Sequence, residues 1–169
     1  LLGGFKSWQE EGGRNPKFKF PGIPYVLLHT LAHALMLELA LESGYPASSV
    51  KERIYAIREG TGAASQHRLG VLIYAASTGA QGTLGGLVGT ASNVPAIIER
   101  ALERLRICSN DPICADHEPV NPNGDRNLHG AACHGCVLVA ETSCEKRNEY
   151  LDRALLVETM AANGAGLFG

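Results

Sequence analysis

YVLLHTLAHALMLELALES, residues 25–43, contains the longest apolar run of the chain. Its leucines spread around most of a helical cylinder, which predicts a helix that is buried on more than one side. Gly44 stands where a glycine that ends a helix is expected. His29, His33 and Glu38 interrupt the run, and a bilayer span needs about 20 mostly apolar residues. We therefore expect a core helix over residues 25–43 and no association with a membrane.

The segments after this helix predict a small sheet and a second helix. Arg53–Ile57 has the composition of a strand, and residues 70–76, GVLIYAA, form a nearly all-apolar run that is typical of a buried central strand. Between residues 92 and 108, apolar side chains recur at helical spacing behind Pro95. This pattern predicts an amphipathic helix with the proline in its first turn.

The domain organisation follows from length and from the distribution of turn-forming residues. A chain of 169 residues fits one domain. Residues 1–24 show no periodicity and are expected to form an irregular arm, whereas residues 25–169 form the domain. Residues 108–144 are rich in Pro, Asn, Gly and Asp, and Asn148 is expected to cap a last helix. The predicted fold class is mixed α/β: a small buried sheet with flanking helices and an irregular Cys-rich zinc lobe.

The charge of the chain excludes a strongly basic nucleic-acid-binding protein. Lys and Arg total 15 against 17 Asp and Glu, which gives a formal net charge of −2, whereas free-standing DNA-binding domains usually show a basic excess. Two sets of basic residues leave local DNA contacts open, with an ordinary solvated face as the alternative. They are Arg100, Arg104 and Arg106 in the second helix, and Lys6, Arg14, Lys17 and Lys19 in the arm.

The strongest chemical signal is the spacing of the five cysteines, Cys108-x5-Cys114 and Cys133-x2-Cys136-x7-Cys144. A Cys-x2-Cys turn places two thiolates on one tetrahedral metal. A structural zinc supplies about 10–16 kcal/mol of coupled folding free energy, which is enough to order a loop of low apolar content. The alternatives are small buried hydrophobic residues or a redox pair. Because no signal-peptide pattern begins the sequence, we expect a reducing, cytoplasmic compartment.

Five sulfurs exceed the four positions of a tetrahedral zinc, so the ligand set needs a choice. We expect Cys114, Cys133, Cys136 and Cys144 to hold the metal. The fourth position has alternatives close by, which are Cys108, His117, His129 and His134. A set of four thiolates favours a closed structural site over a catalytic site with Glu141 as its base.

Two other motifs do not assemble into an active site. His29 and His33 share one face of the first helix, but a metalloprotease motif has Glu directly after the first His, where this chain has Thr30. We expect both histidines to be structural and hydrogen-bonded to the Gly-rich loop or to the zinc lobe. The Gly-rich segment 79–89 follows a strand, but it lacks the Gly-Lys-Ser/Thr of a phosphate-binding loop. We therefore expect no enzymatic activity.

Several strings, taken in order along the chain, resemble one protein family. They are LLHTLAH (residues 27–33), ERIY (52–55), GVLIY (70–74), GTLGGL (82–87), CSNDPIC (108–114), ACHGC (132–136) and ETSCE (141–145). Together they resemble the C-terminal zinc-binding domain of the DrmB family, which belongs to the DISARM anti-phage system. A more divergent version of this domain closes the MrfA-type DNA-repair helicases.

This resemblance implies a zinc held by cysteines and a supporting role beside a DNA-translocating ATPase. In the helicase version, the Cys-x2-Cys pair and the later cysteine match Cys133, Cys136 and Cys144, whereas the upstream cysteines are spaced differently. The expected function is therefore a non-catalytic, zinc-binding accessory domain of a DISARM-type defence protein. It would support a partner helicase, similar to DrmA, in engaging DNA. The alternatives are a C-terminal domain of a DNA-repair helicase, or a metal- or phosphate-dependent enzyme that uses the Gly-rich loop.

Overall fold

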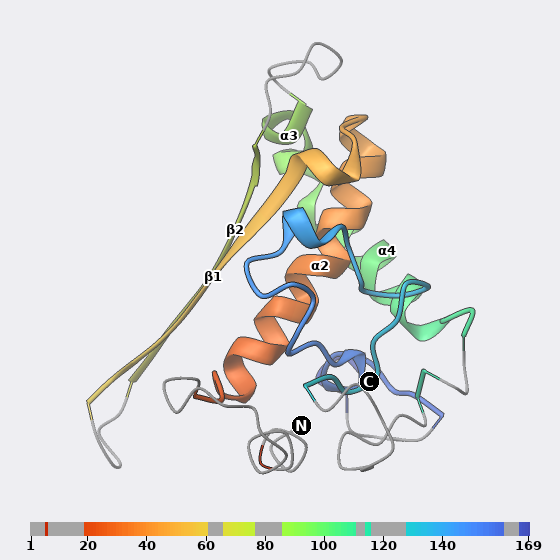
Figure 1. Ribbon diagram of the computed structural model, residues 1–169. Coiled ribbons are helices and arrows are strands. Elements are labelled where there is room, and N and C mark those ends of the chain that lie inside the picture. The colour runs from red at the N-terminus through yellow and green to blue at the C-terminus, as the bar shows by residue number, and fades with distance from the viewer. Residues whose placement is uncertain are drawn as a thin grey trace.

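One long helix organises the computed structural model, which describes residues 6, 19–60, 66–76, 86–110, 114–115, 128–160 and 166–169. This helix, α2 (Ile23–Ser43), begins with Pro24 in its first turn and ends at Gly44. Gly44 adopts a left-handed φ of 72°, which favours glycine, and its N–H donates to the carbonyl of Ala40. Figure 1 shows α2 at the centre, between the sheet and α4. The predicted core helix is confirmed.

The surface of α2 is covered by other parts of the chain. Val26, Ala32 and Ala34 are completely buried, and Met36 is nearly so. Among the described residues, α2 alone has the length and apolar composition that could span a bilayer, and more than half of that stretch is buried inside the protein. The contacts of α2 with β1 and α4 explain this burial. A core helix that is apolar on all sides needs such neighbours all round.

The sheet is an antiparallel hairpin of two strands, β1 (Val50–Glu59) and β2 (Gln66–Ala75). Its register pairs Val50 with Ala75 and Ile54 with Val71. Because side chains alternate between the two faces of a strand, Val50 and Ile54 share the face that packs on α2. Figure 1 shows the far end of the hairpin diverging from α2.

Residues 70–75 form a strand as predicted, but the prediction that this strand is central and buried is wrong. Most of β2 is exposed or half-buried. Leu72 is 47% exposed and Tyr74 is 37% exposed, on the face opposite to α2. The physical reason is that a two-stranded sheet has no central strand, and α2 covers only one of its faces. The mixed α/β fold class itself is confirmed.

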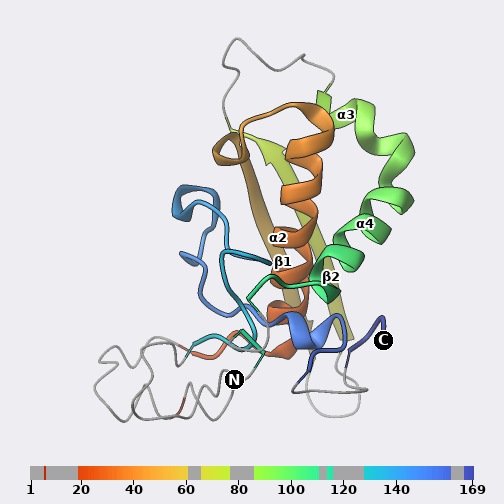
Figure 2. The same cartoon turned by 90° about the vertical axis from the view of Figure 1, so that its right-hand side faces the viewer.

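The second predicted helix is also confirmed. It follows a short helix, α3 (Gly86–Gly89), and a 3-10 turn, and forms α4 (Val94–Arg106) with Pro95 in its first turn. Ile97, Ala101 and Leu105 are buried on one side, and this side packs on α2, as Figure 2 shows. Helical periodicity was sufficient to locate this element because its apolar stripe faces a single neighbour.

The arginines of α4 form ion pairs within the molecule. Glu38 of α2 lies 3.4 Å from Nε of Arg100 and 3.3 Å from Nε of Arg104. Arg104 also donates to the carbonyl oxygen of Ala34 at 3.0 Å, and Arg106 pairs with Glu103 at 2.9 Å. Arg100 and Arg104 therefore link α4 to α2, and Arg106 forms an ion pair within α4. These arginines do not form a free basic face.

The Cys-rich segment packs against α2 and α4 without an α-helix over residues 128–160. Two 3-10 turns, Glu141–Ser143 and Arg153–Leu155, are its regular elements. The helix predicted to begin at Asn148 is wrong. Asn148 has a left-handed φ of 64°, and its side chain bonds instead to the backbone N–H and carbonyl of Val139. An asparagine in this conformation ties two loops together and does not start a helix.

Candidate metal centres

Two groups of buried side chains could each hold a metal ion. The four-cysteine group consists of Cys108, Cys114, Cys133 and Cys136. The mixed group consists of His29, His33, Glu52 and Cys144. Within each group, the donor atoms all lie within 4.8 Å of one another.

The sulfur atoms of the four-cysteine group have the spacing of a tetrahedral zinc site. Sγ of Cys133 lies 3.5 Å from Sγ of Cys108 and 3.6 Å from Sγ of Cys136. Sγ of Cys136 lies 3.8 Å from Sγ of Cys114. A Zn–S bond of about 2.3 Å gives a tetrahedral edge of about 3.8 Å, whereas a disulfide needs about 2.05 Å. The four thiols therefore fit one zinc ion and are not paired as disulfides.

Local backbone geometry brings these cysteines together. Cys108 follows the end of α4, and the N–H groups of Cys136 and Val137 both donate to the carbonyl of Cys133, which closes the Cys-x2-Cys turn. Gly135 lies within this turn, where an added Cβ would be 2.7 Å from Oγ of Ser109. A glycine at this position therefore allows the turn to approach the segment after α4.

A buried cation lies close to the four-cysteine group. Arg153 is completely buried and donates to the carbonyl of Leu105 at 2.8 Å. A hydrogen bond with Cys136, aided by Arg153, lowers the pKa of Cys114 to about 5. Burial raises the pKa of Cys108 to about 11. A divalent cation bound by four thiolates leaves negative charge, which Arg153 helps to balance.

The structure unites three of the four predicted zinc ligands and separates the other. Cys114, Cys133 and Cys136 lie in one group, but Cys108 joins them and Cys144 does not. The reason is the 3-10 turn Glu141–Ser143, after which Cys144 faces α2, with its Sγ 3.1 Å from Nε2 of His29. Of the alternatives, His129 and His134 belong to neither group of described residues, and His117 lies outside those residues.

The mixed group combines three elements of the fold. His29 and His33 lie one turn apart on α2, with ring centroids 4.5 Å apart. Glu52 on β1 points between them, with Oε1 3.5 Å from Nε2 of His29 and 3.9 Å from Nε2 of His33. The prediction that the histidines bond to the Cys-rich lobe is confirmed, because His33 lies 2.8 Å from the carbonyl of Val137.

Sequence reasoning missed Glu52. A signal was present, because Glu52 alternates with Val50 and Ile54 on the face of β1 that packs on α2, where a charge needs a partner. Burial acts to raise the pKa of Glu52, but its interactions with His29 and then His33 outweigh it and hold that pKa below its usual range. Burial also lowers the pKa of His29. The ionised carboxylate therefore lies beside a neutral imidazole of His29.

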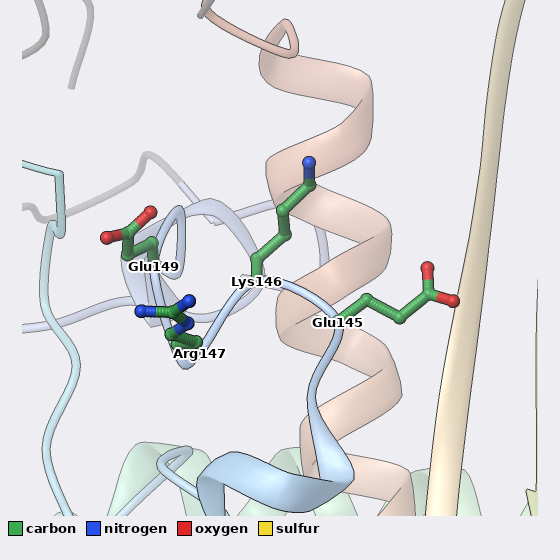
Figure 3. A pocket seen from close by; sticks show the side chains of 4 residues that line it. All are labelled: Glu145, Lys146, Arg147 and Glu149. Atoms are coloured by element: carbon green, nitrogen blue, oxygen red, sulfur yellow. The ribbon is translucent and has the colours of Figure 1, made fainter. Parts of the chain in front are cut away.

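A surface pocket of about 270 Å³ lies beside the mixed group, lined by Glu145, Lys146, Arg147 and Glu149. Figure 3 shows Glu145 extending toward β1, while the side chains of Arg147 and Glu149 extend away from it. Two acidic and two basic side chains compensate one another here. The pocket therefore offers no convergent set of charges for an anion or a cation.

The four-cysteine group has a counterpart among known domain families. The profile of the MrfA Zn-binding domain (MZB) matches residues 31–137. The chain belongs to the MrfA Zn-binding domain family. The matched residues include all of the four-cysteine group, whereas His29 and Cys144 of the mixed group lie outside them.

The chain is also similar to the DISARM protein DrmB of Bacillus paralicheniformis. The two are 43% identical over 166 residues, which covers 97% of this chain and 28% of that relative. The resemblance drawn from the sequence strings is thereby confirmed. The chain spans little more than a quarter of the length of this relative.

Proposed function

We propose that the chain is a zinc-stabilised, non-catalytic accessory domain of a DISARM-type anti-phage defence protein. The observation that carries this proposal is the four-cysteine group, with its sulfur edges of 3.5–3.8 Å. Membership in a Zn-binding domain family and the similarity to DrmB across nearly the whole chain support it. That similarity favours a defence protein over a DNA-repair helicase as the source of the domain.

The donor set supports a structural role for the zinc. A catalytic zinc keeps one coordination position open for water or substrate, whereas four thiolates fill a tetrahedral site. All four cysteines are buried. Bound zinc would join the end of α4 at Cys108 to the turn at Cys133, two segments with little regular structure of their own. The five free thiols also fit a reducing cytoplasm, in which we place the protein.

The accessory role concerns a partner helicase and DNA. Affinity for a duplex rises with the number of phosphates that basic side chains neutralise. The chain has a net charge of −2, and Arg100 and Arg104 are paired with Glu38. Of the arm, Lys6 and Lys19 lie within the described residues, whereas Arg14 and Lys17 lie outside them. We infer that the domain contributes weakly to DNA affinity by itself and acts through a helicase subunit.

The test measures zinc content and DNA affinity together. The protein is titrated with fluorescent duplex and single-stranded DNA, with and without the helicase subunit, at two salt concentrations. We expect weak, salt-sensitive binding that tightens when the helicase is added. Cys133→Ser should remove one zinc equivalent and abolish the tightening. Equal affinity with and without the helicase would contradict the accessory role, and folded protein without zinc would contradict the zinc site.

A further inference from the structure

We propose that His29, His33, Glu52 and Cys144 form a second zinc site, separate from the four-cysteine group. It joins α2 and β1 to the Cys-rich segment, which lies far from both in the sequence. The proposal does not depend on the defence function. It rests on the donor atoms, their spacing, their hydrogen bonds and their burial.

The donors and their spacing suit zinc. Two imidazole nitrogens, one thiolate and one carboxylate oxygen are all common zinc ligands, at about 2.0–2.3 Å. Tetrahedral edges between such donors, of which only one is a sulfur, are about 3.3–3.6 Å. Nε2 of His29 lies 3.1 Å from Sγ of Cys144 and 3.5 Å from Oε1 of Glu52, and Nε2 of His33 lies 3.9 Å from Oε1. All four donor atoms lie within 4.8 Å of one another, so small side-chain movements would bring them to coordination distance.

Backbone carbonyls fix both imidazoles in the form that binds a metal. Nδ1 of His33 lies 2.8 Å from the carbonyl of Val137, and Nδ1 of His29 lies 3.3 Å from the carbonyl of Tyr150. A carbonyl only accepts, so each Nδ1 carries the proton and each neutral ring keeps its lone pair on Nε2. Metal-binding histidines are held in this way, with the far nitrogen bonded to a carbonyl or carboxylate.

Two polar atoms of the group have no hydrogen-bond partner among the described residues. They are Nε2 of His33 and Oε2 of Glu52. Both side chains are completely buried. An unsatisfied buried polar atom costs about 1–3 kcal/mol, and such atoms are rare in folded proteins unless an ion or water is missing. A cation among the four donors would satisfy the lone pair of His33 directly.

The backbone after Cys144 wraps around its sulfur. Sγ of Cys144 accepts the N–H groups of Lys146 at 3.3 Å and of Asn148 at 3.2 Å. Arg147, Asn148 and Tyr150 adopt φ values of 52°, 64° and 61°, a conformation that costs non-glycine residues about 1–3 kcal/mol each. These two N–H donors would stabilise the thiolate that forms when a metal binds. Figures 1 and 2 both show this segment running alongside α2.

The charges of the group also balance around a divalent cation. Glu52 and the thiolate of Cys144 each supply one negative charge, and the two histidines are neutral ligands. With Zn²⁺ the site is electrically neutral, which suits four buried side chains. The competing arrangement is a His29–Glu52 ion pair beside a neutral thiol. It would leave Nε2 of His33 unpaired.

A surface depression of about 270 Å³ lies next to the site. Its lining includes Glu52 and Cys144, together with Tyr74 and Ser143. Coordination by four protein groups leaves no position for substrate, so this second zinc is also structural.

The experiment counts zinc ions and identifies their ligands. The 169-residue chain is purified from zinc-supplemented cells, and loosely bound metal is removed by gel filtration. Its zinc content is measured by elemental mass spectrometry, and the zinc ligands are identified by X-ray absorption spectroscopy. We expect two zinc ions per chain and a mixed shell of sulfur and nitrogen or oxygen. His33→Gln/Glu52→Gln should hold one zinc with an all-sulfur shell. The matched control His67→Gln/Glu59→Gln makes the same changes at exposed positions of the hairpin and should hold two.

Each outcome decides the proposal. Wild-type protein with one zinc in an all-sulfur shell would overturn it, whether or not the variants fold. Retention of two zinc ions by His33→Gln/Glu52→Gln would overturn it as well. Cys133→Ser separates this inference from the four-cysteine site, because it should leave one zinc in a shell dominated by nitrogen and oxygen with a single sulfur.

Discussion

The two metal groups differ most in the sequence distance between their ligands. The four-cysteine group gathers residues 108–136, with two ligands in one Cys-x2-Cys turn. The mixed group joins His29 and Cys144, which are 115 positions apart. The first can organise a local segment, whereas the second can form only after α2, β1 and the Cys-rich segment have come together.

This difference separates two structural tasks. Zinc at the four-cysteine group would join the end of α4 to the Cys-x2-Cys turn, a region with little regular structure among the described residues. A metal at the mixed group would fix the positions of α2 and β1 relative to the Cys-rich segment, since each of the three supplies a ligand. Loss of the first should therefore disorder a segment, and loss of the second should loosen the packing between segments.

The largest expected effect is that of Cys136→Ser. We expect loss of one zinc ion and local unfolding around the four cysteines, at residues 108–110 and 133–136, before the rest of the domain, because a structural zinc contributes about 10–16 kcal/mol to folding. Hydrogen exchange read by mass spectrometry would show loss of protection in this segment, while α2 stays protected.

Cys144→Ser is the comparison for this variant. It removes the only sulfur of the mixed group and should leave residues 108–110 and 133–136 protected. If the two variants lose protection in the same residues, the two groups do not have separate roles.

Glu52→Gln is expected to have the next largest effect. Removing one member of a buried set of charges costs about 3–5 kcal/mol, because Glu52 is completely buried between His29 and His33. Urea denaturation followed by circular dichroism gives the change in unfolding free energy. Glu59→Gln changes a carboxylate that is paired with Arg68 but exposed, and should cost less than about 1 kcal/mol. Equal effects of the two substitutions would contradict a buried site.

Gly130→Ala tests the contact between Gly130 and residues 150–153, a segment that reaches both metal groups. Gly130 donates to the carbonyl of Leu151 at 2.9 Å, and an added Cβ would lie 2.2 Å from Cγ of Asp152. Asp152 precedes Arg153, which lies beside the four-cysteine group, and Tyr150 bonds to His29. We expect a loss of about 1–3 kcal/mol of stability from this overlap.

Gly89→Ala is the control for Gly130→Ala. Nothing lies within 4 Å of a Cβ at Gly89, which ends α3. Alanine there should leave the melting temperature unchanged or raise it slightly. If the Gly130→Ala and Gly89→Ala proteins have the same melting temperature, Asp152 can move away from the added methyl group without loss of stability.

Local signals in the sequence were sufficient for α2 and α4, but not for the burial of the sheet or for the segment after Asn148. The apolar pattern of residues 92–108 located α4 because one stripe faces one neighbour. The apolar run of residues 70–76 predicted burial, but Leu72 and Tyr74 lie on a face that no described element covers. Alternation identifies the two faces of a strand, and only the tertiary fold determines what covers each face.

The candidate sites show the same limit. The Cys-x2-Cys turn predicted Cys133 and Cys136 correctly as neighbours, since the spacing itself brings the sulfurs together. Cys144 follows only eight positions later, but a 3-10 turn carries it to His29. Proximity in sequence predicted Cys144 beside the other cysteines, whereas the structure places it beside His29. The local signals of the mixed group were His29 and His33 one helical turn apart, and the charged Glu52 on a buried strand face.

Arg53→Gln should have the smallest effect, and it sharpens the comparison at the edge of the mixed group. Arg53 donates to Oε1 of Glu145 at 2.8 Å. The side chain of Arg53 is 54% exposed and that of Glu145 is 40% exposed. The pair fastens the turn after Cys144 to β1, but exposed ion pairs contribute only about 0–1 kcal/mol. We expect unchanged zinc content and a stability loss below about 1 kcal/mol that shrinks further at high salt. Loss of a zinc ion from this variant would mean that the outer ion pair, and not the buried donors, holds Cys144 in place, which would contradict the arrangement proposed for the second site.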